Sequence, residues 1–198
     1  MTREELIKEL AKFRHNVPSI SGAGFISRLL WMHAHEKASI YQMDMAYPTS
    51  MCLGLALAAP KQRVLAVEGD GSIIMAMSVF TTISRYRPEN LIVCIVDNGV
   101  YGSAGGGEVE TATSHGTDIA AVACACGIPD DKTVNVSSSD AAFEAFERAF
   151  SEPGPWVIVA KVDKSDLTLV RSPSNTCPYD IVETSINFRR EMIDRGYD

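Results

Sequence analysis

The sequence has no block of basic residues. Its 198 residues include 18 Lys and Arg against 25 Asp and Glu, a formal net charge of −7. A surface that binds nucleic acid needs clustered Lys and Arg to neutralise phosphates. The charge pattern therefore argues against nucleic acid as a partner.

Long apolar runs are also missing. No segment approaches the ~18 apolar residues of a membrane-spanning helix. Residues 1–13 are charged and amphipathic, unlike the apolar centre of a signal peptide. The five cysteines include no C-x-x-C pair, which argues against an iron–sulfur site. We therefore predict a cytoplasmic protein without structural disulfides or membrane contact. Four cysteines lie in apolar runs and are predicted to be buried: Cys52, Cys94, Cys124 and Cys126.

Two apolar, β-branched runs, at residues 64–67 and 91–96, are typical of buried strands. The apolar spacing between them predicts one helix, which Ser72 caps and which ends near Arg87. A strand–helix–strand unit of this kind forms a parallel sheet through a right-handed crossover. The sequence therefore predicts an α/β fold with helices on both faces of a parallel sheet. Its length and 46% hydrophobic content predict a single domain over residues 1–198.

The later part of the chain continues this pattern. Helices are predicted over residues 141–150 and 186–193, and a further buried strand over residues 156–162. Residues 165–198 form a C-terminal tail of mixed composition. The tail either covers the domain or contacts a partner, and the sequence does not choose between these.

A polar cluster follows each of the two strands. Gly69-Asp70-Gly71-Ser72 ends the first, and Asp97-Asn98-Gly99-Val100 ends the second. Ligands of open parallel sheets bind outside the carboxyl ends of the strands, so both clusters are placed for binding. Either cluster by itself reads as a turn. Together they predict a site for a divalent cation and a phosphate group.

The cation in this interpretation is Mg²⁺, which prefers oxygen ligands. Asp70 supplies a carboxylate, Asn98 an amide oxygen and Val100 a main-chain carbonyl. Gly69 and Gly71 let the backbone approach the phosphates closely. The amides around Gly71 and Ser72 lie at a predicted helix N-terminus, which favours anions.

The motif Gly-Asp-Gly, with Asn98 28 positions after Asp70, resembles the cofactor motif of the thiamine diphosphate-dependent enzymes. The similarity covers about residues 15–163. It is closest to the branch of sulfopyruvate decarboxylase β subunits and the C-terminal half of phosphonopyruvate decarboxylases. The segments that carry it, besides the motif, lie at residues 24–28, 54–60, 63–64, 97–106, 113–115, 118–121 and 123–127.

This resemblance implies the diphosphate-binding (PP-type) fold, with thiamine diphosphate and Mg²⁺ as cofactors. Met45 falls where related enzymes carry a large apolar residue that bends the cofactor; the alternative is an ordinary core methionine. The implied cofactor-binding residues are Gly24, Phe25, Met45, Gly69, Gly71, Ser72, Asn98, Val100 and Tyr101. The implied metal ligands are Asp70, Asn98 and Val100.

The resemblance also implies a split enzyme. The family's second, pyrimidine-binding domain and its activating glutamate have no counterpart in 198 residues, so no residue here is assigned that role. We expect an α-type partner subunit that carries the pyrimidine domain, a hetero-oligomer such as α2β2 or larger, and a small 2-oxo acid as substrate. His115, beside the glycine-rich loop, is the candidate to line the substrate entrance; the alternative is an ordinary loop residue. His15 is expected at the surface, and His33 and His35 are given no direct chemistry.

Two loops depart from the family pattern. In residues 43–49, Tyr47 replaces a histidine, and Met43 and Ala46 replace glycines. Residues 103–107 lack a hydroxyl and an amide that the relatives carry. These loops face the substrate, so the reaction is either decarboxylation or, with the same cofactor, that of a carboligase or lyase. A third interpretation is a non-catalytic scaffold with a remnant cofactor site.

Overall fold

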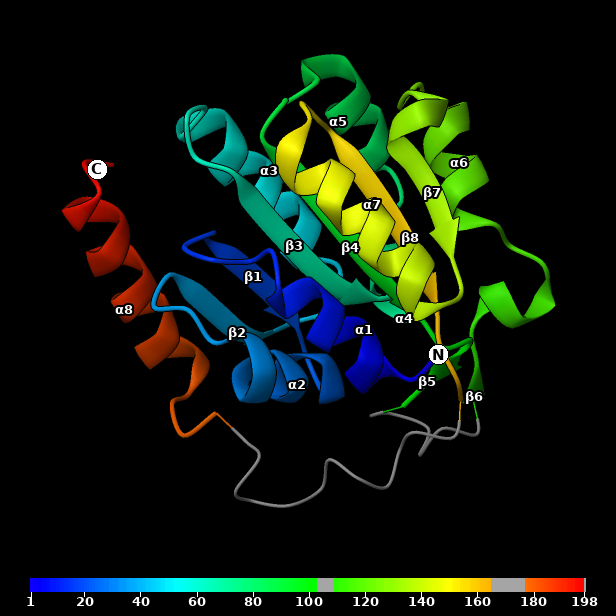
Figure 1. The fold of residues 1–198 in the computed structure, drawn as a ribbon, viewed down its shortest axis with the longest axis horizontal. Helices are drawn as coiled ribbons and strands as arrows, with labels where there is room; N and C mark the ends of the chain where they lie inside the picture. The colour runs from blue at the N-terminus through cyan, green and yellow to red at the C-terminus, as the bar shows by residue number, and fades with distance from the viewer. Residues whose placement is uncertain (103–108, 165–176, 198) are drawn as a thin grey trace.

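The computed structural model describes residues 1–102, 109–164 and 177–197. Six strands form one sheet in the order β2-β1-β3-β4-β8-β7 (Figure 1). Every neighbouring pair in this sheet is parallel, which confirms the predicted class. The strands of the sheet are β1 (Ser19–Gly22), β2 (Ser39–Met43), β3 (Val64–Gly69), β4 (Leu91–Asp97), β7 (Thr133–Val136) and β8 (Trp156–Lys161). A separate antiparallel pair is formed by β5 (Val100–Tyr101) and β6 (Val109–Glu110).

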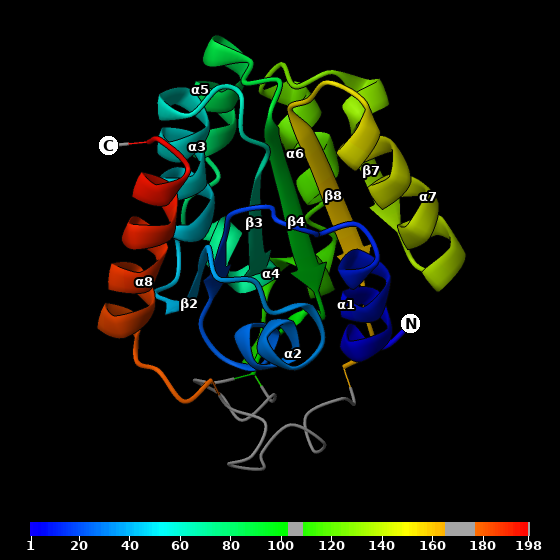
Figure 2. The same ribbon diagram turned by 60° about the vertical axis from the view of Figure 1, so that its left-hand side comes forward.

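Helices cover both faces of the sheet (Figure 2). The first face carries α1 (Arg3–Ala11), α2 (Phe25–Ala34) and α7 (Ser139–Ser151). They share a core that includes Leu10, Leu29 and Phe146. The opposite face carries α3 (Pro48–Ala58), α5 (Val79–Tyr86), α6 (Ile119–Ala125) and α8 (Ile181–Asp194). Their core includes Leu53, Phe80 and Met192. The remaining short helices are α4 (Asp70–Ile74), η1 (Ala112–His115) and η2 (Asp130–Lys132).

The strands predicted at residues 64–67, 91–96 and 156–162 are confirmed as β3, β4 and β8. Every residue of β4 is buried, and so are the first five of β3. A central parallel strand is covered on both faces, so its sequence is continuously apolar instead of alternating. The helix predicted over residues 141–150 is α7, which is slightly longer.

The single helix predicted after Ser72 is wrong. The segment instead forms α4 and α5, separated by tight turns in which N–H groups bond three residues back, as from Ala76 to Ile73. The N-cap of α4 is Gly69, and Ser72 lies inside the helix with its hydroxyl bonded elsewhere. Apolar spacing alone does not distinguish one helix from two short ones, because both bury the same side chains.

The described part of the C-terminal tail covers the domain. Helix α8 packs beside β2 and α3, and its Phe188 and Met192 are at most 9% exposed. It begins earlier than the predicted residue 186, because Asp180 and Glu183 form a capping box at its start. Residues 165–176 lie outside the described residues.

The cysteine prediction is half right. Cys52 and Cys94 are buried, whereas Cys124 and Cys126 are only half-buried. The short helix α6 buries its Ile119, Ala120 and Ala123 side, which leaves the cysteines nearer the surface. Within the described ranges, no helix is long and apolar enough to cross a membrane.

Candidate functional site

The predicted site lies where three neighbouring strands end. Gly24 follows β1, Asp70 follows β3 and Asn98 follows β4, and β3 lies between β1 and β4 in the sheet. Their carboxyl ends therefore meet at one edge, the binding edge of an open parallel sheet. Sequence positions up to 74 residues apart (98 − 24) are brought together in this way.

The side chain of Asn98 reaches both other predicted metal ligands. Its terminal amide atom lies 2.9 Å from the main-chain oxygen of Val100 and 3.2 Å from Asp70 Oδ1. With nitrogen at this position, the amide donates to both oxygens. With oxygen there, three oxygens converge without a proton between them. A bound divalent cation would favour the second arrangement, since Mg²⁺ accepts all three kinds of oxygen ligand.

Asp70 is buried, with 1% of its surface exposed. The hydroxyls of Thr111 and Thr113 contact Asp70 Oδ2, which leaves Oδ1 facing Asn98. Burial raises the pKa of Asp70, the neighbouring Asp97 charge adds to the rise, and the threonine hydrogen bonds oppose it. A cation would offset this desolvation and favour the carboxylate.

Asp97 is held in a different way. Its Oδ1 accepts a hydrogen bond from the Gly99 N–H at 3.1 Å and also lies 2.8 Å from Thr113 Oγ1, whose single proton serves either this oxygen or Asp70 Oδ2. Lys161 pairs with Asp97 Oδ2. Both carboxylate oxygens of Asp97 therefore have partners within the protein. In the described part of the chain, no three His, Cys, Asp or Glu side chains gather as a metal site. A cation here would thus have Asp70 as its carboxylate ligand, with neutral oxygens beside it.

Gly71 is required by close packing. A Cβ at this position would lie 2.4 Å from Cε1 and 2.7 Å from Cδ1 of Tyr101. The Tyr101 ring, on the short strand β5, therefore covers the backbone of α4 directly after Asp70. Sequence reasoning placed both residues at the cofactor, and the structure places them against each other. At Gly69, by contrast, an added Cβ would make only ordinary contacts, the nearest with Ile26 at 3.7 Å.

The start of α2 forms a second wall. Gly24 is its N-cap, with φ 91° and ψ −142°, and as a glycine it provides no side-chain cap. The first N–H groups of a helix have no intrahelical partner, and they favour an anion. The contact between Ile26 and the Gly69 position shows that this helix start adjoins the end of β3. Gly24 and Phe25 thus lie at the same edge of the sheet as Asp70.

The loop that contains Met45 is tied to the same corner. The Ala46 N–H donates to Ser72 Oγ at 2.9 Å, and Ser72 in turn donates to Glu68. Glu68 is fully buried and also accepts from the backbone N–H of Thr49 at 3.1 Å. Burial raises the pKa of Glu68, opposed by these hydrogen bonds. Met45 itself is half-buried beside this network.

Among the described residues, His33, His35 and His115 pair with residues other than the predicted metal ligands. His115 is at the surface, its side chain 71% exposed, and its Nε2 is 3.1 Å from Glu110 Oε2. His15 is exposed, as expected. His33 pairs with Glu4 at 3.1 Å, and His35 Nδ1 lies 2.9 Å from the Tyr41 hydroxyl.

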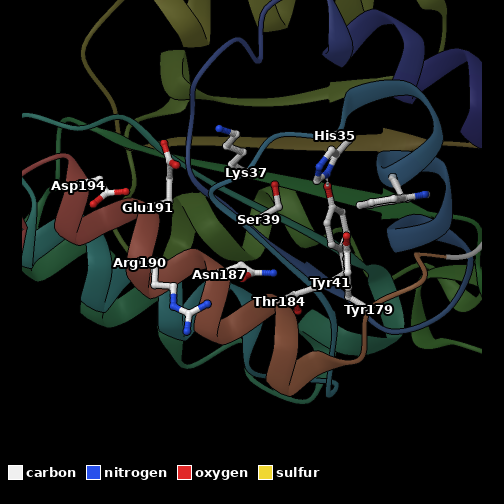
Figure 3. A pocket seen from close by; sticks show the side chains of 11 residues that line it. His35, Lys37, Ser39, Tyr41, Tyr179, Thr184, Asn187, Arg190, Glu191 and Asp194 are labelled. Atoms are coloured by element: carbon white, nitrogen blue, oxygen red, sulfur yellow. Dashed lines mark hydrogen bonds between the residues drawn. The ribbon is translucent and has the colours of Figure 1, made fainter.

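A cavity of about 270 Å³ lies between α8 and β2 (Figure 3). The side chains around it are partly aromatic and partly charged. Its lining residues are Trp31, His35, Lys37, Ser39, Tyr41, Tyr179, Thr184, Asn187, Arg190, Glu191 and Asp194. None of the predicted site residues lines it, so it forms no part of the candidate site.

Sequence reasoning missed the residues that hold the site in place. Thr111 and Thr113 contact Asp70. Glu68 holds the loop that contains Met45 through Ser72, and Gln42 holds Gly24 at the start of α2. Glu68 directly precedes the Gly-Asp-Gly motif, and this position in the sequence could have identified it as a residue of the site. The threonines lie 41 and 43 positions from Asp70, so nothing local in the sequence connects them. The departing loop at residues 103–107 lies in the part of the chain that is not described.

The chain is similar to proteins that use thiamine diphosphate. The family model "Thiamine pyrophosphate enzyme, C-terminal TPP binding domain" matches residues 24–160. Sulfopyruvate decarboxylase subunit beta of Methanococcus maripaludis is 33% identical over 162 residues, which cover 81% of this chain and 84% of the relative. Phosphonopyruvate decarboxylase of Streptomyces viridochromogenes is 30% identical over 169 residues, which cover 84% of this chain and 41% of the relative.

Solved structures agree on the fold. The benzoylformate decarboxylase from Polynucleobacter necessarius superposes with a TM-score of 0.67 at 20% identity, over 82% of this chain. The chain spans about a third of that protein, 33% of its length. The family match covers the strand ends at which the predicted ligands lie, from Gly24 to Ala160 within β8. The chain therefore belongs to the thiamine pyrophosphate enzyme family that shares this C-terminal TPP binding domain.

Proposed function

We propose that this chain is the diphosphate-binding, β-type subunit of a thiamine diphosphate- and Mg²⁺-dependent 2-oxo acid decarboxylase. The observation that carries the proposal is the convergence of Asp70, Asn98 and the Val100 carbonyl at the ends of adjacent strands. The names of the relatives, sulfopyruvate and phosphonopyruvate decarboxylases, support a small 2-oxo acid as substrate.

In this proposal the chain binds and orients the cofactor. Asp70, Asn98 and the Val100 carbonyl would hold Mg²⁺, while the start of α2 at Gly24 and Phe25 would hold the diphosphate. Gly71 and Ser72 would contribute main-chain contacts. The bound cofactor supplies the nucleophilic carbon and the electron sink for decarboxylation.

The other parts of the proposed site surround this core. Met45, on the loop tied to Ser72, would support the cofactor, and Tyr101 would close the site over Gly71. His115 lies on the surface and is retained as a candidate for the substrate entrance. A pyrimidine-domain partner would supply the activating glutamate. The name "subunit beta" of two relatives supports such a partner. A hetero-oligomer such as α2β2, and a cytoplasmic location, stay predictions.

Calorimetric titration of thiamine diphosphate with Mg²⁺ tests the proposal, on this chain alone and mixed with its partner subunit. We expect Asp70→Asn to abolish Mg²⁺-dependent binding, because it removes the carboxylate ligand. Asp131→Asn is the matched control, since that carboxylate is 71% exposed and makes only a long ion-pair contact of 4.0 Å with Lys132 among the described residues. Unchanged affinity in Asp70→Asn would refute the assigned metal site.

The reaction is tested on the complex of the two subunits. Product analysis with and without an acceptor aldehyde separates decarboxylation from carboligation. The departures at Tyr47 and Ala46 make this comparison necessary, because both lie on the loop beside Met45. If neither the chain alone nor the mixture with the partner subunit binds the cofactor, the scaffold interpretation takes precedence.

A further inference from the structure

Gln42 lies at an irregularity of β2, next to the start of α2. Ile20 pairs with Ile40, but Gly22 pairs with Met43, so β2 carries one extra residue over this interval. Such a bulge redirects the chain and is common beside binding sites. Gln42 itself has φ 60°, a left-handed conformation that is costly for a residue with a Cβ.

The Gln42 carboxamide binds both backbone groups of a single glycine. Its Oε1 accepts the Gly24 N–H at 2.8 Å, and its Nε2 donates to the Gly24 carbonyl at 3.1 Å. Gly24 is the N-cap of α2 and has a positive φ of 91°. A glycine in this region is free to rotate unless it is held, because it lacks a Cβ. The Gln42 side chain therefore orders the residue from which α2 begins.

The Gln42 backbone holds the first turn of the same helix. Its N–H donates to Ser27 Oγ at 2.8 Å, and Ser27 donates to the Gly22 carbonyl at 2.8 Å. Ser27 is fully buried. One residue thus joins the end of β1, the N-cap of α2 and its first turn, while its main chain leads to Met45.

We propose that Gln42 is a positioning residue for the anion-binding end of α2. Its carboxamide holds Gly24 so that the uncapped first turn of α2 is aimed at the diphosphate. The inference rests on the proposed function. It assigns a role to a residue outside the Gly-Asp-Gly motif, on the strand at the edge of the sheet.

Gln42→Gly separates the side chain from the backbone conformation. Glycine adopts φ 60° without strain, so we expect the melting temperature to be maintained. The affinity for thiamine diphosphate with Mg²⁺ should fall at least about tenfold, because two hydrogen bonds that order Gly24 are lost. Magnesium pyrophosphate should lose the same factor, since the effect is confined to the diphosphate end. Amide hydrogen exchange at Gly24 should become faster.

Gln42→Glu and Asn16→Gly complete the set. Gln42→Glu keeps an acceptor for the Gly24 N–H but turns an oxygen toward the Gly24 carbonyl and adds a negative charge, so we expect a larger loss of affinity. Asn16 also has a positive φ, 62°, and it precedes β1 at the other end of the sheet. Asn16→Gly should therefore leave the affinity unchanged.

The cofactor titrations distinguish a failure of the proposed function from a failure of the role assigned to Gln42. They are made on the isolated chain or, if binding requires it, on the complex with the partner. If the wild type does not bind the cofactor, the proposed function fails and this inference fails with it. If the wild type binds and Gln42→Gly binds equally well while Gly24 exchange has accelerated, only the role of Gln42 is refuted. An equal loss in Asn16→Gly would also refute that role.

Discussion

Replacing Gly71 by alanine tests the packing at the centre of the site. The new Cβ would lie 2.4 Å from Tyr101 Cε1, far inside van der Waals contact. Gly71 is buried in α4, and the ring lies on β5, so one of the two elements has to move. The substitution therefore measures whether Tyr101 covers the motif.

The expected loss follows from two opposing contributions. Overpacking a filled position costs about 1–3 kcal/mol. Alanine inside a helix is more favourable than glycine by up to about 1 kcal/mol. We therefore expect a net loss of about 1–2 kcal/mol in the free energy of unfolding. For a domain of this size this corresponds to a decrease of about 2–8 °C in Tm.

Urea denaturation and thermal melting measure this loss, with Gly54→Ala as the matched control. Gly54 lies inside α3, and a Cβ there meets nothing within 4 Å, so the control should be stabilised by up to about 1 kcal/mol. In a Tyr101→Ala background, Gly71→Ala should become neutral or stabilising, because the obstructing ring is gone. If Gly71→Ala is stabilised like Gly54→Ala in the wild-type background, the reasoning is refuted.

Three further predictions concern the domain around the site. Burial raises the pKa of Cys94 to about 12, so iodoacetamide at pH 8 should label this thiol only after unfolding; labelling of the folded protein would contradict its burial. Arg148 lowers the pKa of Glu152 below 4.5, so this carboxylate stabilises the fold above pH 4.5. The melting temperature of Glu152→Gln should fall below that of the wild type at pH 7, and the difference should disappear as the pH falls through the lowered pKa. Lys161→Ala leaves the 3%-exposed Asp97 without the ion pair to Lys161 and should cost about 1–3 kcal/mol in urea denaturation, which Lys161→Arg should largely avoid.

The sheet could be predicted because the sequences of its central strands match a buried strand clearly. The runs at β3 and β4 are continuously apolar and β-branched, and each ends at a polar cluster. Edge strand β2 is shorter and less apolar, and its bulge at Gln42 has no signature in the sequence. The division of the predicted helix into α4 and α5 was missed for a similar reason, since both arrangements bury Ile73 and Phe80.

The convergence of Asp70, Asn98 and the Val100 carbonyl could be predicted because the chemistry and spacing of these residues lie in the chain itself. Asp70 and Asn98 each follow a strand, and parallel pairing brings strand ends together. The residues that hold Asp70 could not be predicted this way. Thr111 and Thr113 reach it from beyond β5 and β6, and common residues such as threonine carry no signal of a contact so distant in sequence.

The sequence by itself determined the fold class, the strands that end at the candidate site and the oxygen-bearing groups that meet there, because these depend on local composition and order. The tertiary structure alone decided how those groups are held. The Gln42 clamp on Gly24 and the contact of Tyr101 with Gly71 join segments that are remote in the chain. Such contacts arise from packing and hydrogen bonding across elements, whose partners are specified only once the chain has folded.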